Sequence, residues 1–346
     1  MSENSIIFDP NAVGNKNCGI YGLPFTPQTA SAVLIPVPWD VTTSYGGGTF
    51  QGPEAILEAS YQVDLYHPDF PTGWEAGYAM LDSPQNWIKE NNALRDKAAQ
   101  IIAALEDGQD IAADPKLQKS LDQLNQKSEK LNQWVEETAD FWLDQGRFVG
   151  LVGGDHSTPL GLLRALAKRV PHFGILHIDA HMDLRIAYEG FTYSHASIMH
   201  NAMQLKSIAR LVQVGIRDYC EQEWQASLDS KGRIKVFTDQ DIKRQLFMGK
   251  TFESICKKII NALPDLVYIS VDIDGLEPSL CPNTGTPVAG GFSLEHVSYL
   301  LSLLAPAKKT VIGFDLVEVS PGNAESQWDA NVGARMLYQL LGYSTL

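Results

Sequence analysis

Short apolar runs rich in β-branched residues alternate along the chain with segments of helical periodicity. Seven runs are candidate strands, at residues 32–38, 148–155, 173–181, 210–217, 235–238, 266–275 and 310–321. Several are apolar at both odd and even positions, which is typical of strands buried on both faces of a sheet. Helical stretches such as 158–170 and 294–305 can connect them as crossovers. The pattern predicts an α/β protein in which helices cover both faces of a parallel sheet.

The segment 84–144 differs, because it is polar, lacks a strand pattern and is rich in Gln, Lys, Asp and Glu. Apolar side chains recur in it at spacings of four and three residues, which predicts one long helix over about 115–145. The stripe consists of Leu117, Leu121, Leu124, Leu131, Val135, Thr138 and Trp142, interrupted by Ser128. It could pair with a partner helix, but its short length favours packing against its own domain. We expect one domain over 1–346 that includes this polar helical segment.

Composition narrows the class of protein. The 346 residues are 44% hydrophobic and 20% charged, as in a folded globular enzyme. The net charge of −14 argues against a nucleic-acid surface, which needs clustered Lys and Arg, and suits a small cationic substrate. We find no long apolar run and no secretory signal, so we expect a cytoplasmic protein without membrane binding. The four cysteines form no CxxC pair, so we expect them to be reduced and structural.

Acidic and imidazole side chains follow three of the predicted strands, in "GGDHST", "HIDAHMD" and "SVDIDG". Residues two apart on an extended chain point the same way, and ligands of open α/β sheets bind at the carboxyl ends of strands. The candidate metal ligands at these ends are His156, Asp179, His181, Asp183, Asp272 and Asp274. Each motif has a simpler explanation, and the residues of "HIDAHMD" could merely be polar residues at a strand end. "GGDHST" could be a phosphate loop, although it lacks the Walker Lys, and Asp272 and Asp274 could cap the next turn.

Four carboxylates and two imidazoles in one partly buried cleft would carry a severe electrostatic cost without cations. Two divalent ions would balance the charge. Oxygen and nitrogen donors without a thiolate favour Mn(II), Fe(II), Co(II) or Ni(II) over a structural zinc. Two such ions can lower the pKa of water towards neutrality, so the site predicts metal-assisted hydrolysis.

The motifs GGDHS, DAHMD and SVDIDGLEPSLCPNTGTPVAGG, in this order, resemble those of the ureohydrolase superfamily of arginases, agmatinases, guanidinobutyrases and formimidoylglutamases. The resemblance covers roughly residues 30–340, including PVPWDVTTSYGGGTFQGPEAILEAS and GFDLVEVSPG, but does not extend to 84–144. It implies an arginase-like three-layer α/β/α fold with a sheet of about eight strands. It also implies two metal ions per chain, manganese first and nickel, cobalt or iron as alternatives, and a homo-oligomer, trimer or hexamer.

The resemblance assigns a role to each candidate ligand. It implies that Asp179 and Asp272 bridge the two ions and that Asp183 also orients the attacking water. One imidazole and one carboxylate complete the shell of each ion: His156 with Asp183, and His181 with Asp274.

Three further residues acquire roles in this way. Glu318, in "DLVEVSP", matches the glutamate that pairs with the substrate guanidinium, for which a carboxylate is a suitable partner; it could instead pair elsewhere at its strand end. His195, in "YSHAS", matches a histidine thought to transfer protons, although Ala196 replaces the glycine that usually follows it. His200 is a second candidate for that task.

Substrate choice depends on Arg185, where arginases carry an asparagine that holds the carboxylate of the amino acid. An arginine there favours guanidino acids or formimidoylglutamate, unless it pairs with Glu189 and does not meet the substrate. His195 favours arginases and agmatinases. We expect agmatinase-like release of urea, with arginase, guanidino-acid hydrolase, formimidoylglutamase and guanidine hydrolase as alternatives.

Two alternatives lie outside this class. An arginase-fold deacetylase would use one zinc and fewer ligands, and a non-catalytic scaffold would have lost ligands, whereas this chain keeps all six. Metal content separates them: two ions per chain for a ureohydrolase, one for a deacetylase and none for a scaffold.

Overall fold

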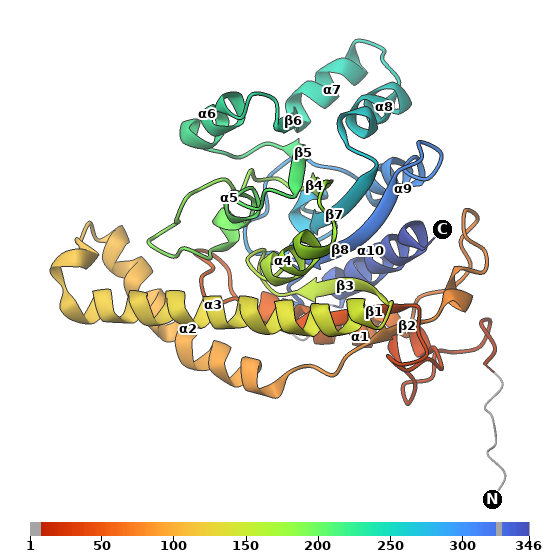
Figure 1. Cartoon of the computed structure of the whole chain (residues 1–346), viewed down its shortest axis with the longest axis horizontal. Helices are drawn as coiled ribbons and strands as arrows, with labels where there is room; N and C mark the ends of the chain where they lie inside the picture. Colours follow the sequence, from red (N-terminus) through yellow and green to blue (C-terminus); the bar gives the residue numbers. More distant parts are fainter. Residues whose placement is uncertain (1–7, 323–326, 346) are drawn as a thin grey trace, which may run out of the picture.

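The computed structural model describes residues 8–322 and 327–345 and is built around one sheet (Figure 1). Residues 1–7, on which the expectation of no secretory signal partly rests, lie outside the described residues. The sheet order is β2-β1-β3-β8-β7-β4-β5-β6, and all neighbours are parallel. The strands are β1 (Ala32–Val37), β2 (Tyr78–Met80), β3 (Phe148–Gly153), β4 (Phe173–Ile178), β5 (Ile208–Ile216), β6 (Ile234–Thr238), β7 (Leu266–Asp272) and β8 (Thr310–Val317).

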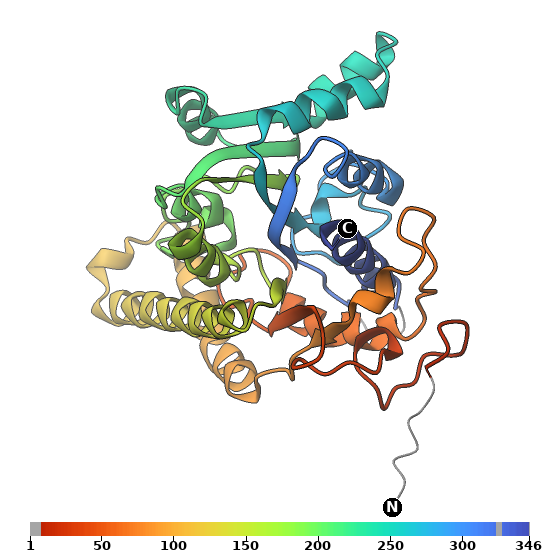
Figure 2. The same ribbon diagram turned by 45° about the vertical axis from the view of Figure 1, so that its right-hand side comes forward.

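Helices cover both faces of this sheet, as Figures 1 and 2 show from two directions. Side chains of α1 and α7 to α10 join one apolar core, and those of α2 to α5 join the other. The helices are α1 (Gly52–Ser60), α2 (Gln85–Glu106), α3 (Pro115–Asp144), α4 (Leu160–Arg169), α5 (Ile198–Ala202), α6 (Glu221–Asp229), α7 (Asp239–Phe247), α8 (Phe252–Ala262), α9 (Leu294–Ser302) and α10 (Trp328–Ser344). The predicted three-layer fold with a parallel sheet of eight strands is confirmed.

The apolar runs predict seven of the eight strands. β2 is the exception, because three residues are too few to show a periodicity. Within β1, Leu34 joins one core while Val33 and Ile35 join the other, as the alternation of side chains along a strand requires. Burial on both faces is therefore the reason that these runs are apolar at odd and even positions alike.

The segment 84–144 forms two helices, α2 and α3. Helix α3 begins after Asp114, whose side chain accepts hydrogen bonds from the backbone N–H groups of Lys116 and Leu117. Its predicted stripe faces inward, with Leu124, Leu131, Val135 and Trp142 buried in the core shared with α2 and α4. Packing against its own domain, rather than a coiled coil with a partner, accounts for the stripe.

The strand order places the carboxyl ends of β3, β8, β7 and β4 side by side. The three motifs that carry the candidate ligands follow three of these four central strands, and Glu318 follows the fourth. The topology thus collects residues from far apart in the sequence at one edge of the sheet, as open α/β folds do.

Two smaller expectations concern the cysteines and the membrane. All four cysteines are free thiols, and Cys256 and Cys281 are buried. Within residues 8–322 and 327–345, none of the helices has the length and apolar character needed to cross a bilayer.

Candidate metal centre

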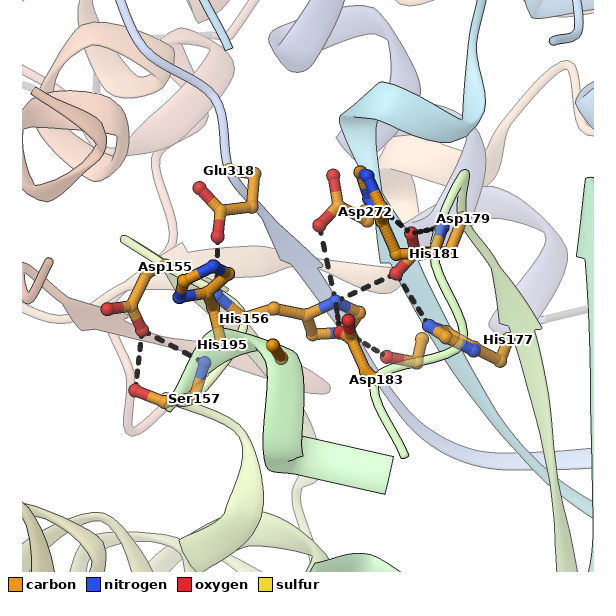
Figure 3. A network of polar contacts seen from close by, with 12 residues as sticks. Asp155, His156, Ser157, His177, Asp179, His181, Asp183, His195, Asp272 and Glu318 are labelled. Carbon is orange, nitrogen blue, oxygen red and sulfur yellow. Dashed lines mark hydrogen bonds and ion pairs between the residues drawn. The ribbon is translucent and has the colours of Figure 1, made fainter. Parts of the chain in front are cut away.

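The Nδ1 atom of His156 faces three carboxylates (Figure 3). It lies 3.0 Å from Asp179 Oδ2, 3.1 Å from Asp183 Oδ2 and 3.2 Å from Asp272 Oδ2, and it forms no hydrogen bond within the described residues. The opposite ring atom, Nε2, lies 2.9 Å from the hydroxyl of Ser270.

The hydrogen bonds of the Ser270 hydroxyl determine which nitrogen of His156 carries the proton. The Ser270 hydroxyl donates to Asp315 Oδ1 at 3.0 Å, so it must accept a hydrogen bond from His156 Nε2–H. In the neutral ring, Nδ1 then presents a lone pair to the carboxylates. Four lone-pair atoms that converge on one buried point repel one another unless a proton on Nδ1 or a metal cation lies among them.

A second group of donors forms around His181. Its Nδ1 lies 3.0 Å from Asp274 Oδ2 and 3.5 Å from Asp179 Oδ1. Asp179 therefore directs one oxygen to each imidazole and is common to both groups. Asp272 divides its oxygens differently: Oδ1 caps the following turn by accepting from the Asp274 N–H, while Oδ2 faces His156. The capping explanation and the ligand explanation of Asp272 are thus compatible.

The electrostatics of the cluster require positive charge. Burial, together with the charges of Asp274 and Asp179, raises the pKa of Asp272 well above its usual value. Burial and the charge of Asp179 raise the pKa of Asp183 to about 7. Burial would lower the pKa of His156, but its three carboxylate neighbours raise it well above the usual value.

Across the described ranges, no lysine or arginine forms an ion pair with any of these carboxylates. The uncompensated charge, the free Nδ1 of His156 and the all-oxygen-and-nitrogen donor set fit two divalent cations.

His177 and Gln213 hold Asp179 in place from behind. The Gln213 side-chain amide donates to the Met182 carbonyl at 2.7 Å and to His177 Nδ1 at 3.0 Å. His177 must therefore donate from Nε2 to Asp179 Oδ2, at 2.7 Å. This bond orients the carboxylate shared by both donor groups, as hydrogen bonds behind metal ligands do.

Glu318 presents a free carboxylate oxygen beside the cluster. Its Oε1 accepts a hydrogen bond from the backbone N–H of His156 at 3.0 Å, while Oε2 is buried and without a partner among the described residues. Burial and the charges of Asp272 and Asp155 raise its pKa well above the usual value. Both Glu318 and Asp183 have a left-handed backbone, with φ of 63° and 54°, a strain often found at functional sites.

A pocket opens beside the cluster. Its walls are formed by Ser44, His181, Asp183, Arg185, Tyr188, His195, Ala196, Asp218, Tyr219, Glu223 and Thr286. His195 is half-buried there, and burial with the nearby His181 and His156 lowers its pKa, so the ring is neutral at neutral pH. This lining does not include His200, which lies on α5 with its backbone N–H bonded to the Asp183 carbonyl.

Arg185 lines the pocket but already has partners. Its Nε lies 3.8 Å from Glu223 Oε2, and its guanidinium stacks 4.6 Å from the centre of the Tyr188 ring. The ion pair of Arg185 is therefore with Glu223. The sequence suggests Glu189 as the alternative partner, and that suggestion is wrong. The spacing of 38 residues between Arg185 and Glu223 hides this pair from sequence inspection.

Six pocket residues were not singled out from the sequence: Ser44, Tyr188, Asp218, Tyr219, Glu223 and Thr286. Ser44 and Thr286 lie within quoted motifs, and the other four lie outside them. Asp218 is the second residue after the end of β5, so the strand-end argument that identified the other carboxylates could have included it. Its side chain is 69% exposed and its Oδ2 lies 4.0 Å from His181 Nε2.

Comparisons with known proteins agree with this geometry. The model of the family described as the arginase family matches residues 30–342. The N(1)-aminopropylagmatine ureohydrolase of Thermus thermophilus is 32% identical over 329 residues, which cover 94% of this chain and 95% of the relative. The agmatinase of Bacillus subtilis is 28% identical over 318 residues, covering 91% and 92%.

Solved structures share the fold. The agmatine ureohydrolase of Thermoplasma volcanium superposes with a TM-score of 0.69 at 23% identity, covering 94% of both chains. The proclavaminate amidino hydrolase of Streptomyces clavuligerus gives a TM-score of 0.66 at 24% identity, covering 94% and 96%.

Proposed function

This chain belongs to the arginase family, and from this premise we propose that it hydrolyses a guanidino compound with an amine at its far end, as in agmatine. It is a hydrolase that acts on amidino C–N bonds and releases urea. The observation that carries the proposal is the convergence of two imidazoles and four carboxylates beside the free oxygen of Glu318.

The two donor groups would hold two divalent ions, one at His156, Asp179, Asp183 and Asp272, the other at His181, Asp179, Asp272 and Asp274. Such ions neutralise the carboxylates and lower the pKa of water, which makes hydrolysis possible at neutral pH. Manganese is the metal that we propose, with nickel, cobalt and iron as alternatives.

The protein's own side chains bind the substrate and move its proton. The unpartnered Oε2 of Glu318 can accept hydrogen bonds from the guanidinium N–H groups and so orient the guanidine carbon towards the centre. Neutral His195, in the pocket wall, can take up a proton and return it to the leaving amine.

The charges at the outer pocket favour a cationic tail. Asp218 and Glu223 contribute two carboxylates against the single guanidinium of Arg185, and Glu223 already pairs with that guanidinium. Asp218 therefore remains to attract an amine. One observation favours a second candidate: Arg185 lines the pocket, so a guanidino acid could bind its guanidinium.

A substrate panel distinguishes the two candidates. We expect agmatine to have a higher kcat/KM than 4-guanidinobutyrate, guanidinoacetate, arginine, formimidoylglutamate or guanidine with the Mn²⁺-loaded protein. Asp218→Asn should lower kcat/KM for agmatine by up to about fivefold, a small effect because the side chain is exposed.

Arg185→Ala tests the second candidate, in which the guanidinium of Arg185 binds the carboxylate of a guanidino acid. The substitution should not lower kcat/KM for agmatine, because removing the guanidinium leaves Glu223 as a second carboxylate in the pocket. A preferred carboxylate substrate whose turnover falls in Arg185→Ala, but not in Asp218→Asn, would replace the amine proposal by the guanidino-acid one.

Glu318→Gln should lower kcat/KM by roughly 30- to 5,000-fold, because losing one charge of a buried pair costs about 2–5 kcal/mol. The amide oxygen introduced by this substitution can still accept the N–H of His156, so the backbone should stay in place. Steady-state kinetics with metal analysis check this prediction. Unchanged kcat/KM with two metal ions per chain would mean that Glu318 is not the guanidinium partner.

We also propose that the chain acts as one domain in the cytoplasm and forms a homo-oligomer, a trimer or hexamer. Light scattering at micromolar concentration should give a mass at least three times the 38.1 kDa of one chain. A monomeric mass would contradict the proposed assembly.

A further inference from the structure

Helices α2 and α3, which lie outside the family motifs, contact two of the loops that contribute to the pocket wall. We propose that polar side chains of this helix pair position these loops: Asn91 and Arg95 of α2 hold residues 40–50, and Asn125 of α3 holds residues 189–197. Figures 1 and 2 show the two helices side by side along one flank of the sheet. The inference rests on the proposed function, since the pocket is taken to bind the guanidino substrate.

The first loop, residues 40–50, is held through Asp40 and Asn91, both almost fully buried. The Asn91 side chain accepts from the Asp40 N–H at 2.7 Å and donates to Asp40 Oδ1 at 3.0 Å. The other carboxylate oxygen of Asp40 accepts from the Gly48 N–H at 2.8 Å and so closes the loop on itself. Asn91 thus links α2 to both ends of this loop.

Arg95 holds the middle of the same loop. Its Nη1 donates to the carbonyl oxygens of Val41 at 3.0 Å and Thr43 at 2.6 Å. The next residue, Ser44, lines the pocket. Beyond it, a side-chain carbon added at Gly46 would come within 2.9 Å of the Gly285 carbonyl oxygen, whereas one at Gly47 would meet nothing within 4 Å. The charge-assisted bonds from Arg95 therefore fix the chain where it enters the pocket wall.

The second loop, residues 189–197, is held by Asn125 of α3. The Asn125 side chain accepts from the Thr192 N–H at 2.9 Å and donates to the Gly190 carbonyl at 3.1 Å. Gly190 has φ of 81° and lies against Leu121 of the same helix, where a side-chain carbon would come within 2.9 Å of Leu121 Cδ2. His195 follows three residues after Thr192, so Asn125 sets the start of the turn that carries it.

These contacts differ from those that hold the helices on the sheet. The apolar stripe of α3 supplies the packing, whereas Asn91, Arg95 and Asn125 direct their polar groups to loop backbone. Backbone groups of a loop have no strand partners, so a side chain that pairs with them selects one loop conformation. The helix pair thereby acts as a positioning element of the pocket.

The test uses Arg95→Ala and Asn125→Ala in the full-length, Mn²⁺-loaded protein, with two matched controls. Lys97→Ala removes a contact between α2 and α3 that reaches no loop, and Gln118→Ala removes an exposed contact with Asp122 within α3. Backbone amide exchange, kcat and KM are measured together with metal content.

We expect amide exchange to accelerate by at least about fivefold in residues 41–48 of Arg95→Ala and in residues 190–194 of Asn125→Ala, the worth of one lost hydrogen bond. Arg95→Ala should mainly raise KM, because its loop forms the wall. Asn125→Ala should mainly lower kcat, because its loop carries His195, and Asn125→Asp should restore part of kcat by keeping the acceptor for Thr192. Metal content and both controls should match the wild type.

Exchange that stays unchanged in both loops would overturn the proposal, as would exchange that rises equally throughout the sheet. Should Asn125→Ala fail to fold, Asn125→Asp decides by the same exchange measurement. If the wild type releases no urea from any guanidino compound, the proposed function fails, while amide exchange still decides whether the helices position the loops.

Discussion

Replacing Asp179 by alanine is expected to remove metal and activity together, with urea release falling by more than about 10³-fold. One oxygen of Asp179 faces His156 and the other faces His181, so the substitution damages both donor groups. It also leaves the Nε2–H of His177 without its acceptor at 2.7 Å. Metal analysis by mass spectrometry should then find fewer than two ions per chain.

Asp218→Asn is the matched control for this experiment. It removes a carboxylate from the same pocket, but Asp218 belongs to neither donor group, so two ions should remain. Asp179→Ala protein that keeps both ions and its activity would exclude Asp179 as the shared ligand.

Replacing His195 by alanine is expected to lower kcat by roughly 10²–10⁴-fold, the usual loss when a general acid or base is removed. His195 lines the pocket beside Asp183, and burial with two neighbouring imidazoles keeps its ring neutral. The variant should retain both metal ions, because His195 lies outside the two donor groups.

His200→Ala separates this role from a general effect of the loop. His200 lies five residues further on and does not line the pocket within the described residues, so its replacement should leave kcat close to that of the wild type. Full activity of His195→Ala would remove that residue from the mechanism. A loss in His200→Ala alone would transfer the proton-transfer role to His200.

The fold was predictable because burial leaves a strong local signal. Apolar runs mark seven of the eight strands, and the α3 stripe buries Leu124, Leu131 and Val135 as its spacing predicts. β2 escaped prediction because Tyr78–Met80 is too short to carry a pattern. The six candidate ligands were also accessible from the sequence, since their positions at strand ends and their i, i+2 spacing favour convergence on one point.

The outer pocket was less predictable, because its contacts join residues far apart in the sequence. The partner of Arg185 is Glu223 and not the nearby Glu189. The hydrogen bonds of Asn91 and Asn125 to the loops likewise join residues that are 51 and 67 positions apart. Each bond selects a loop conformation that local sequence propensity does not determine. Specificity therefore depends on the part of the structure that sequence patterns describe least.

Titration of the metal-free protein with Mn²⁺, followed by urea release from its preferred guanidino substrate, tests the proposed chemistry most directly. We predict that urea release is absent without metal, rises with added Mn²⁺ and saturates at two equivalents per chain. Saturation at one equivalent would indicate a single-metal hydrolase such as an arginase-fold deacetylase, and no urea at any metal loading would indicate a non-catalytic scaffold; either result would contradict a binuclear ureohydrolase.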